Sequence, residues 1–142
     1  MTTVEEHSRE KRLDTDMHRE ALAPRLVVAA LIVSGLGHVV HNLEEFPISI
    51  LIGWETLFPL GVTILLGVAW YRHPGRSTFA AMAGWAAIVI VFGGVSVIPF
   101  GFLPFVPEQS VSHYAAHAVY AVMQLPLLWV GVRGVQSVGP NS

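Results

Sequence analysis

The chain has 142 residues, of which 53% are hydrophobic and only 13% are charged, with a formal net charge of −2. A soluble domain of this length needs a more polar surface, and a nucleic-acid-binding protein needs a basic one. Composition therefore argues against both classes. The chain also has no cysteine, which excludes disulfides and thiolate metal sites.

Residues 1–24 form a polar segment rich in Glu, Asp, Arg and Lys, with few large apolar residues. Such a composition cannot build a core, so we expect a disordered or weakly helical N-terminal tail. A membrane domain follows over residues 25–135, and residues 136–142 form a short C-terminal tail.

Four apolar segments make up the membrane domain. Each has the ~20 residues that cross ~30 Å of hydrocarbon as a helix. Together they leave almost nothing polar to face water, so the sequence predicts an all-α fold, a four-helix transmembrane bundle in the lipid bilayer. The predicted spans are about 26–45, 48–71, 77–99 and 112–132.

The eight basic residues indicate the orientation of these spans. They lie before the first span, between the second and third, and after the fourth. The positive-inside rule places this side in the cytoplasm. We therefore expect an integral multi-pass protein of the plasma or inner membrane, with both termini cytoplasmic. The residues are Arg9, Lys11, Arg12, Arg19, Arg25, Arg72, Arg76 and Arg133.

Two of the predicted helices carry a polar stripe on an otherwise apolar surface. Steps of three and four residues keep side chains on one face, and lipid cannot satisfy such groups, so both stripes should face the bundle interior. The stripe of the first span is Ser34, His38, His41 and Glu45, and that of the fourth is His113, His117, Tyr120 and Gln124.

These two helices are antiparallel, so their stripes can be matched by depth. Glu55 would join from the second span, seven residues in and roughly 10 Å deep. Glu44 lies about 60° around the first helix from His41 and would point toward a neighbour. The predicted pairs are Glu45 with His113, His41 with His117, His38 with Tyr120, and Ser34 with Gln124.

Two chemical interpretations of this cluster stay open. In the first it binds a divalent metal, zinc, iron, manganese or copper, which all accept imidazole and carboxylate ligands. In the second, buried Glu and His exchange protons as general acid and base. The candidate ligands are His38, His41, Glu45, His113 and His117, and the candidate catalytic residues are His41, Glu44, Glu45, Glu55 and His117, supported by Ser34, Asn42, Tyr120 and Gln124.

The run His41-Asn42-Leu43-Glu44-Glu45 resembles the signature of the HXXEE family of small integral membrane proteins. The resemblance covers roughly residues 24–133 and includes the four-span layout. The family is named for its motif rather than for an activity. It implies that His41, Glu44 and Glu45 form the site, and it implies no reaction.

We expect a membrane-embedded enzyme of isomerase, cyclase or oxidoreductase type, with its His/Glu site in the outer half of the bundle. Its substrate would be a lipophilic small molecule, and no nucleic acid is expected as a partner. Two alternatives are a proton- or metal-coupled transporter, and a structural or accessory subunit with a buried polar network. A bundle this small is compatible with a homodimer.

Overall fold

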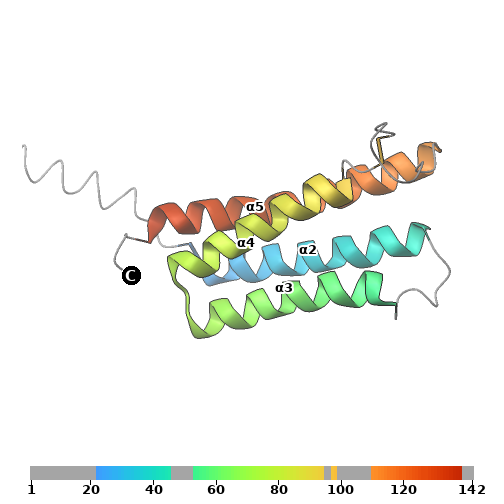
Figure 1. The fold of residues 1–142 in the computed structure, drawn as a ribbon. Helices are drawn as coiled ribbons and strands as arrows, with labels where there is room; N and C mark the ends of the chain where they lie inside the picture. The colour runs from blue at the N-terminus through green and yellow to red at the C-terminus, as the bar shows by residue number, and fades with distance from the viewer. Residues whose placement is uncertain (1–21, 46–52, 95–96, 99–109, 139–142) are drawn as a thin grey trace, which may run out of the picture.

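The computed structural model describes residues 22–45, 53–94, 97–98 and 110–138, and this part of the chain is helical with no strand (Figure 1). Most of the predicted tail at 1–24 lies outside the described residues, as do residues 139–142 of the C-terminal tail. The prediction of an all-α chain is confirmed for the described residues.

Four long helices correspond to the four predicted spans. They are α2 (Pro24–Glu45), α3 (Trp54–Arg72), α4 (Arg76–Val89) with its π-helical extension η2 (Ile90–Gly94), and α5 (Val111–Ser137). Each is long and apolar enough to cross a membrane when η2 is counted with α4.

The helix ends follow local backbone chemistry rather than hydropathy. Proline has no N–H to satisfy and suits the first position of a helix, where α2 begins at Pro24. Ser110 caps α5, because its side chain accepts a hydrogen bond of 3.2 Å from the backbone N of His113. At its other end α5 continues to Ser137, beyond the predicted limit of 132, because loss of apolar character alone does not stop a helix.

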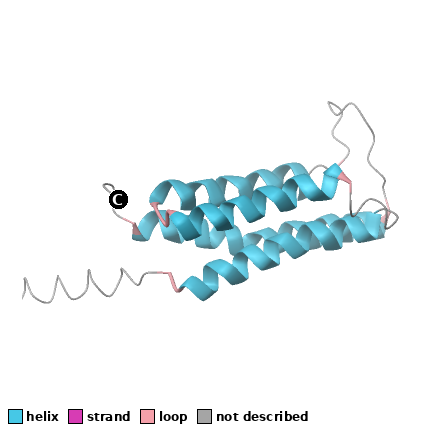
Figure 2. Ribbon diagram, turned by 90° about the horizontal axis from the view of Figure 1, so that it is seen from below, coloured by secondary structure: helices cyan, strands magenta, loops and turns pink. Residues whose placement is uncertain are grey.

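Consecutive helices run in alternating directions and lie side by side (Figures 1 and 2). α2 contacts α3 and α5, and α4 contacts α3 and α5. As a result, four arginines lie on the same end of the molecule, at the start of α2 and α4 and near the end of α3 and α5. They are Arg25, Arg72, Arg76 and Arg133.

The apolar core lies toward this arginine end. Close packing of α4 against α5 depends on glycine: a Cβ built at Gly131 would lie 2.6 Å from the backbone N of Ala83. The core comes from α2, α4 and α5 and consists of Val27, Ala30, Phe79, Met82, Ala86, Leu127 and Val130.

The distribution of polar and apolar side chains is the reverse of that expected for a protein in water. Large apolar side chains are exposed on all four helices, while hydroxyl, amide and imidazole groups are buried between them. This distribution suits a hydrocarbon environment, which stabilises exposed apolar groups and cannot satisfy polar ones. The exposed apolar residues include Ile32, Leu36, Leu57, Leu65, Ile88, Phe92, Val122 and Leu125.

We expect Gly131→Ala to lower the stability of the protein. The added methyl would meet the backbone of α4, which cannot move aside as a side chain can, and overpacking of this kind costs about 1–3 kcal/mol. Gly84→Ala is the matched control, because a Cβ at Gly84 meets nothing within 4 Å. Thermal unfolding in mild detergent should show a lower midpoint for Gly131→Ala only. Equal midpoints would contradict the close contact.

Candidate functional site

The polar stripes of α2 and α5 meet along their length in the register predicted from the sequence. Three of the four expected pairs are in contact, which confirms that register. The fourth, Glu45 with His113, cannot be assessed because the Glu45 side chain lies outside the described residues. The closest polar atoms are 2.6 Å apart for Ser34 and Gln124, 2.6 Å for His38 and Tyr120, and 3.4 Å for His41 and His117.

The pair nearest the apolar core is Ser34 and Gln124, both fully buried. The Ser34 hydroxyl donates to Gln124 Oε1 at 2.6 Å, and Gln124 Nε2 donates to the Ser34 carbonyl oxygen at 3.3 Å. The amide is thus held from both ends by one residue of the facing helix.

His38 forms the next layer and uses both of its ring nitrogens. The Thr63 hydroxyl donates its single hydrogen to the Pro59 carbonyl oxygen at 3.0 Å and accepts from Trp85 Nε1 at 3.3 Å. His38 Nε2 must therefore donate to Thr63, 3.3 Å away. His38 Nδ1 is then an acceptor for the Tyr120 hydroxyl at 2.6 Å. This arrangement leaves His38 no nitrogen for a metal, unlike the sequence-based expectation.

His41 is oriented by its sequence neighbour. Asn42 Nδ2 donates to Thr56 Oγ1 at 2.5 Å, so the amide oxygen of Asn42 is turned toward the ring of His41. That oxygen lies 3.0 Å from His41 Nδ1. Because the oxygen is an acceptor, Nδ1 carries the hydrogen and the lone pair of the neutral ring lies on Nε2.

His117 is oriented by the π-helical end of α4. Its Nδ1 donates to the carbonyl oxygen of Gly93, in the last turn of η2, where carbonyl groups have no partner within their own helix. A Cβ at Gly93 would overlap the ring of Tyr120, so the close approach of η2 to α5 requires glycine at this position. His117, like His41, therefore has its lone pair on Nε2.

The two Nε2 atoms face each other across the interface between α2 and α5, 3.4 Å apart. The rings are perpendicular, with an interplanar angle of 88° and centroids 4.6 Å apart. Since both rings donate from Nδ1, neither neutral ring has a hydrogen on Nε2 to offer the other. A proton or a metal cation shared by the two nitrogens would make this contact attractive.

His113 lies beside this pair. It is half-buried, one turn before His117 on α5, and the two ring centroids are 4.5 Å apart. Among the described residues, however, no three His, Asp or Glu side chains already form a group that could hold a metal ion. His113 supplies a further imidazole on the same face of α5 as His117.

Of the predicted acidic residues, only Glu55 has a described side chain. Glu55 is exposed and has no hydrogen bond to a histidine among the described residues, so the structure does not bring it to the pair. α3 begins at Trp54, which puts Glu55 in its first turn, and the next residue, Thr56, is the buried one. One helical step rotates a side chain by about 100°. Glu44 and Glu45 end α2, and their side chains lie outside the described residues.

Sequence reasoning missed the contributions of α3 and α4. Thr56 and Thr63 are seven residues apart, a spacing that places both on one helix face, and this signal was available in the sequence. Trp85 and Gly93 gave no comparable signal. The role of Gly93 belongs to its backbone carbonyl, which every residue has, and depends on where η2 ends.

Comparison of the chain with protein-family models, curated proteins and solved structures gives no match.

We expect Ser34→Ala to destabilise the protein by about 1–3 kcal/mol, because Gln124 Oε1 would lose its donor in a buried position. Adding Gln124→Met removes the unsatisfied amide, so the double variant should recover part of the loss. A double-mutant cycle of unfolding free energies in detergent measures this coupling. Strictly additive effects would contradict the hydrogen-bonded pair.

Proposed function

We propose that the protein is a membrane-embedded, metal-dependent enzyme whose centre is the pair His41 and His117. The observation that carries this proposal is the facing pair of Nε2 atoms, 3.4 Å apart. A metal-ligating histidine usually donates its other N–H to a backbone carbonyl or a similar acceptor. Both rings have this arrangement, through Asn42 Oδ1 and the Gly93 carbonyl oxygen. Zinc, iron, manganese and copper all accept imidazole nitrogen.

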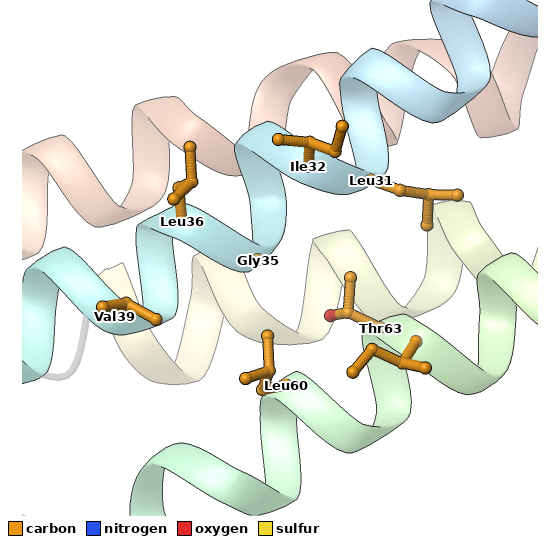
Figure 3. Close-up of a pocket in the computed structure, with 8 residues that line it drawn as sticks. Leu31, Ile32, Gly35, Leu36, Val39, Leu60 and Thr63 are labelled. Atoms are coloured by element: carbon orange, nitrogen blue, oxygen red, sulfur yellow. The ribbon is translucent and has the colours of Figure 1, made fainter. Parts of the chain in front are cut away.

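The proposed substrate is a lipophilic small molecule. An apolar groove of about 290 Å³ lies between α2 and α3 (Figure 3), near the lower limit of ~300 Å³ for small-molecule sites. Thr63 is the one polar residue among those that line it, and its hydroxyl already donates once and accepts twice. The groove therefore offers no unused hydrogen bond and suits the hydrocarbon part of a molecule.

The groove is linked to the histidine pair by contiguous contacts. Thr63 is bonded to His38, and His38 is bonded to the Tyr120 hydroxyl. The Tyr120 ring in turn lies against His41, with centroids 4.7 Å apart. Hydrogen-bonded side chains therefore separate a molecule with its apolar part in the groove from the histidine pair.

The proposed arrangement in the membrane is a four-helix bundle with both termini in the cytoplasm. The common end of Arg25, Arg72, Arg76 and Arg133 supports this orientation through the positive-inside rule. The histidine pair then lies in the outer half, where α2 ends and α5 begins. We further propose that the chain is of the HXXEE type, on the strength of the motif that contains His41.

A transporter would need a polar path past Ser34 and Gln124 to the arginine end. Beyond that pair the helices are joined by the apolar core, which includes Met82, Leu127 and Val130, each 1% exposed or less. The core residues offer an ion no polar ligand, so the arrangement favours a site over a pathway.

We expect a stoichiometric divalent metal in protein purified in mild detergent with an affinity tag that contains no histidine. Elemental analysis should show that metal lost in His41→Ala and His117→Ala, because each removes one ligand. His73→Ala is the control: His73 is an exposed residue in the turn after α3. No metal in the wild type would refute metal dependence and leave acid–base or packing roles for the pair.

Asn42→Leu should weaken metal binding about 10–100-fold, since it removes the acceptor that fixes the tautomer of His41. Asn42→Asp keeps an oxygen acceptor at this position, so its affinity for the metal should be closer to that of the wild type. Competition with a chromogenic chelator measures both affinities. If Asn42→Leu bound as tightly as the wild type, the orienting role of Asn42 would be wrong.

The lipophilic substrate is tested in membranes from cells that express the wild type, His41→Ala or His117→Ala at equal levels. Untargeted mass spectrometry of the lipid extracts should reveal at least one species that changes with the wild type alone. Zn²⁺ flux into proteoliposomes that requires His117 would instead support the transporter.

A further inference from the structure

We propose that the metal is bound tetrahedrally by three histidines, His41, His113 and His117, with the fourth position open to a molecule other than the chain. This inference rests on the proposed function and adds its coordination geometry, its third ligand and its metal. That donor set, three imidazoles and one open position, is typical of catalytic zinc rather than structural zinc, which takes four protein ligands.

The distance between the paired nitrogens is compatible with tetrahedral geometry. Metal–nitrogen bonds to zinc are about 2.0–2.1 Å long. If one zinc ion bound both nitrogens, which lie 3.4 Å apart, the nitrogen–zinc–nitrogen angle would be about 110°. Neighbouring ligands of an octahedral ion enclose about 90° and would need nitrogens about 2.9 Å apart.

His113 is the third ligand that the helix provides. It precedes His117 by four residues, so both rings lie on the same face of α5, and their centroids are 4.5 Å apart. Its backbone N donates a hydrogen bond of 3.2 Å to the side chain of Ser110, the N-cap of α5. Its side chain is half-buried beside that of His117.

The other candidates are in worse positions. Both nitrogens of His38 are used by Thr63 and Tyr120, and Glu55 is exposed on the first turn of α3. Imidazole ligands without thiolate and in tetrahedral geometry favour zinc over manganese, which prefers octahedral oxygen sites.

Cobalt(II) substitution tests the geometry, because a tetrahedral cobalt site absorbs visible light far more strongly than an octahedral one. The purified protein, stripped with chelator and titrated with Co²⁺, should develop an intense visible band that saturates at one ion per chain. A stoichiometric but weak, octahedral spectrum would overturn the inference while leaving the metal site intact. If no divalent metal bound at all, the proposed function itself would be wrong.

His113→Cys tests the third ligand with a gain of signal. The chain has no cysteine of its own, so a new thiolate-to-cobalt charge-transfer band in the near ultraviolet can arise only from position 113. His38→Cys is the matched control and should give no such band. His113→Ala should retain helical circular dichroism, bind Co²⁺ more weakly and show an altered visible band. Absence of the charge-transfer band, or an unchanged spectrum in His113→Ala, would overturn the role of His113.

Discussion

The constraint on which the rest of the structure depends is that polar side chains on helices with apolar surroundings must find partners inside the chain. Every buried side-chain nitrogen or oxygen among the described residues has a polar atom at hydrogen-bonding distance. Several of these partners come from facing helices, so the same contacts that satisfy these groups also join α2 to α3 and α5. Hydrogen bonding here specifies which helix faces meet.

The same constraint determines the protonation pattern of the histidines. Backbone carbonyl oxygens accept and never donate, so the oxygens of Pro59 and Gly93 set the direction of every bond that leads to them. The Pro59 carbonyl takes the hydrogen of Thr63, so His38 must donate to Thr63 from Nε2. The Gly93 carbonyl makes His117 a donor at Nδ1. As a result, both ring nitrogens of His38 are hydrogen-bonded. In His41 and His117 the hydrogen is on Nδ1, and their Nε2 atoms lie 3.4 Å apart.

Polar and apolar contacts occupy different ends of the helices. Toward the arginine end, small residues such as Gly131 let α4 and α5 approach closely around an apolar core. Toward the other end, where α2 ends and α5 begins, imidazole, amide and hydroxyl groups replace that core. A polar site is therefore placed where the helices are held together by hydrogen bonds, and a close-packed apolar layer separates it from the arginines.

The sequence by itself determined the helices, their apolar exterior and the register of α2 against α5. Helical periodicity and antiparallel order leave few ways to match Ser34, His38 and His41 with a stripe of the same spacing. Only the tertiary structure decided which ring nitrogens are donors, that Glu55 faces outward, and that a carbonyl of η2 orients His117. Those features depend on where helices begin and end and on the direction of individual hydrogen bonds, and periodicity carries no information about either.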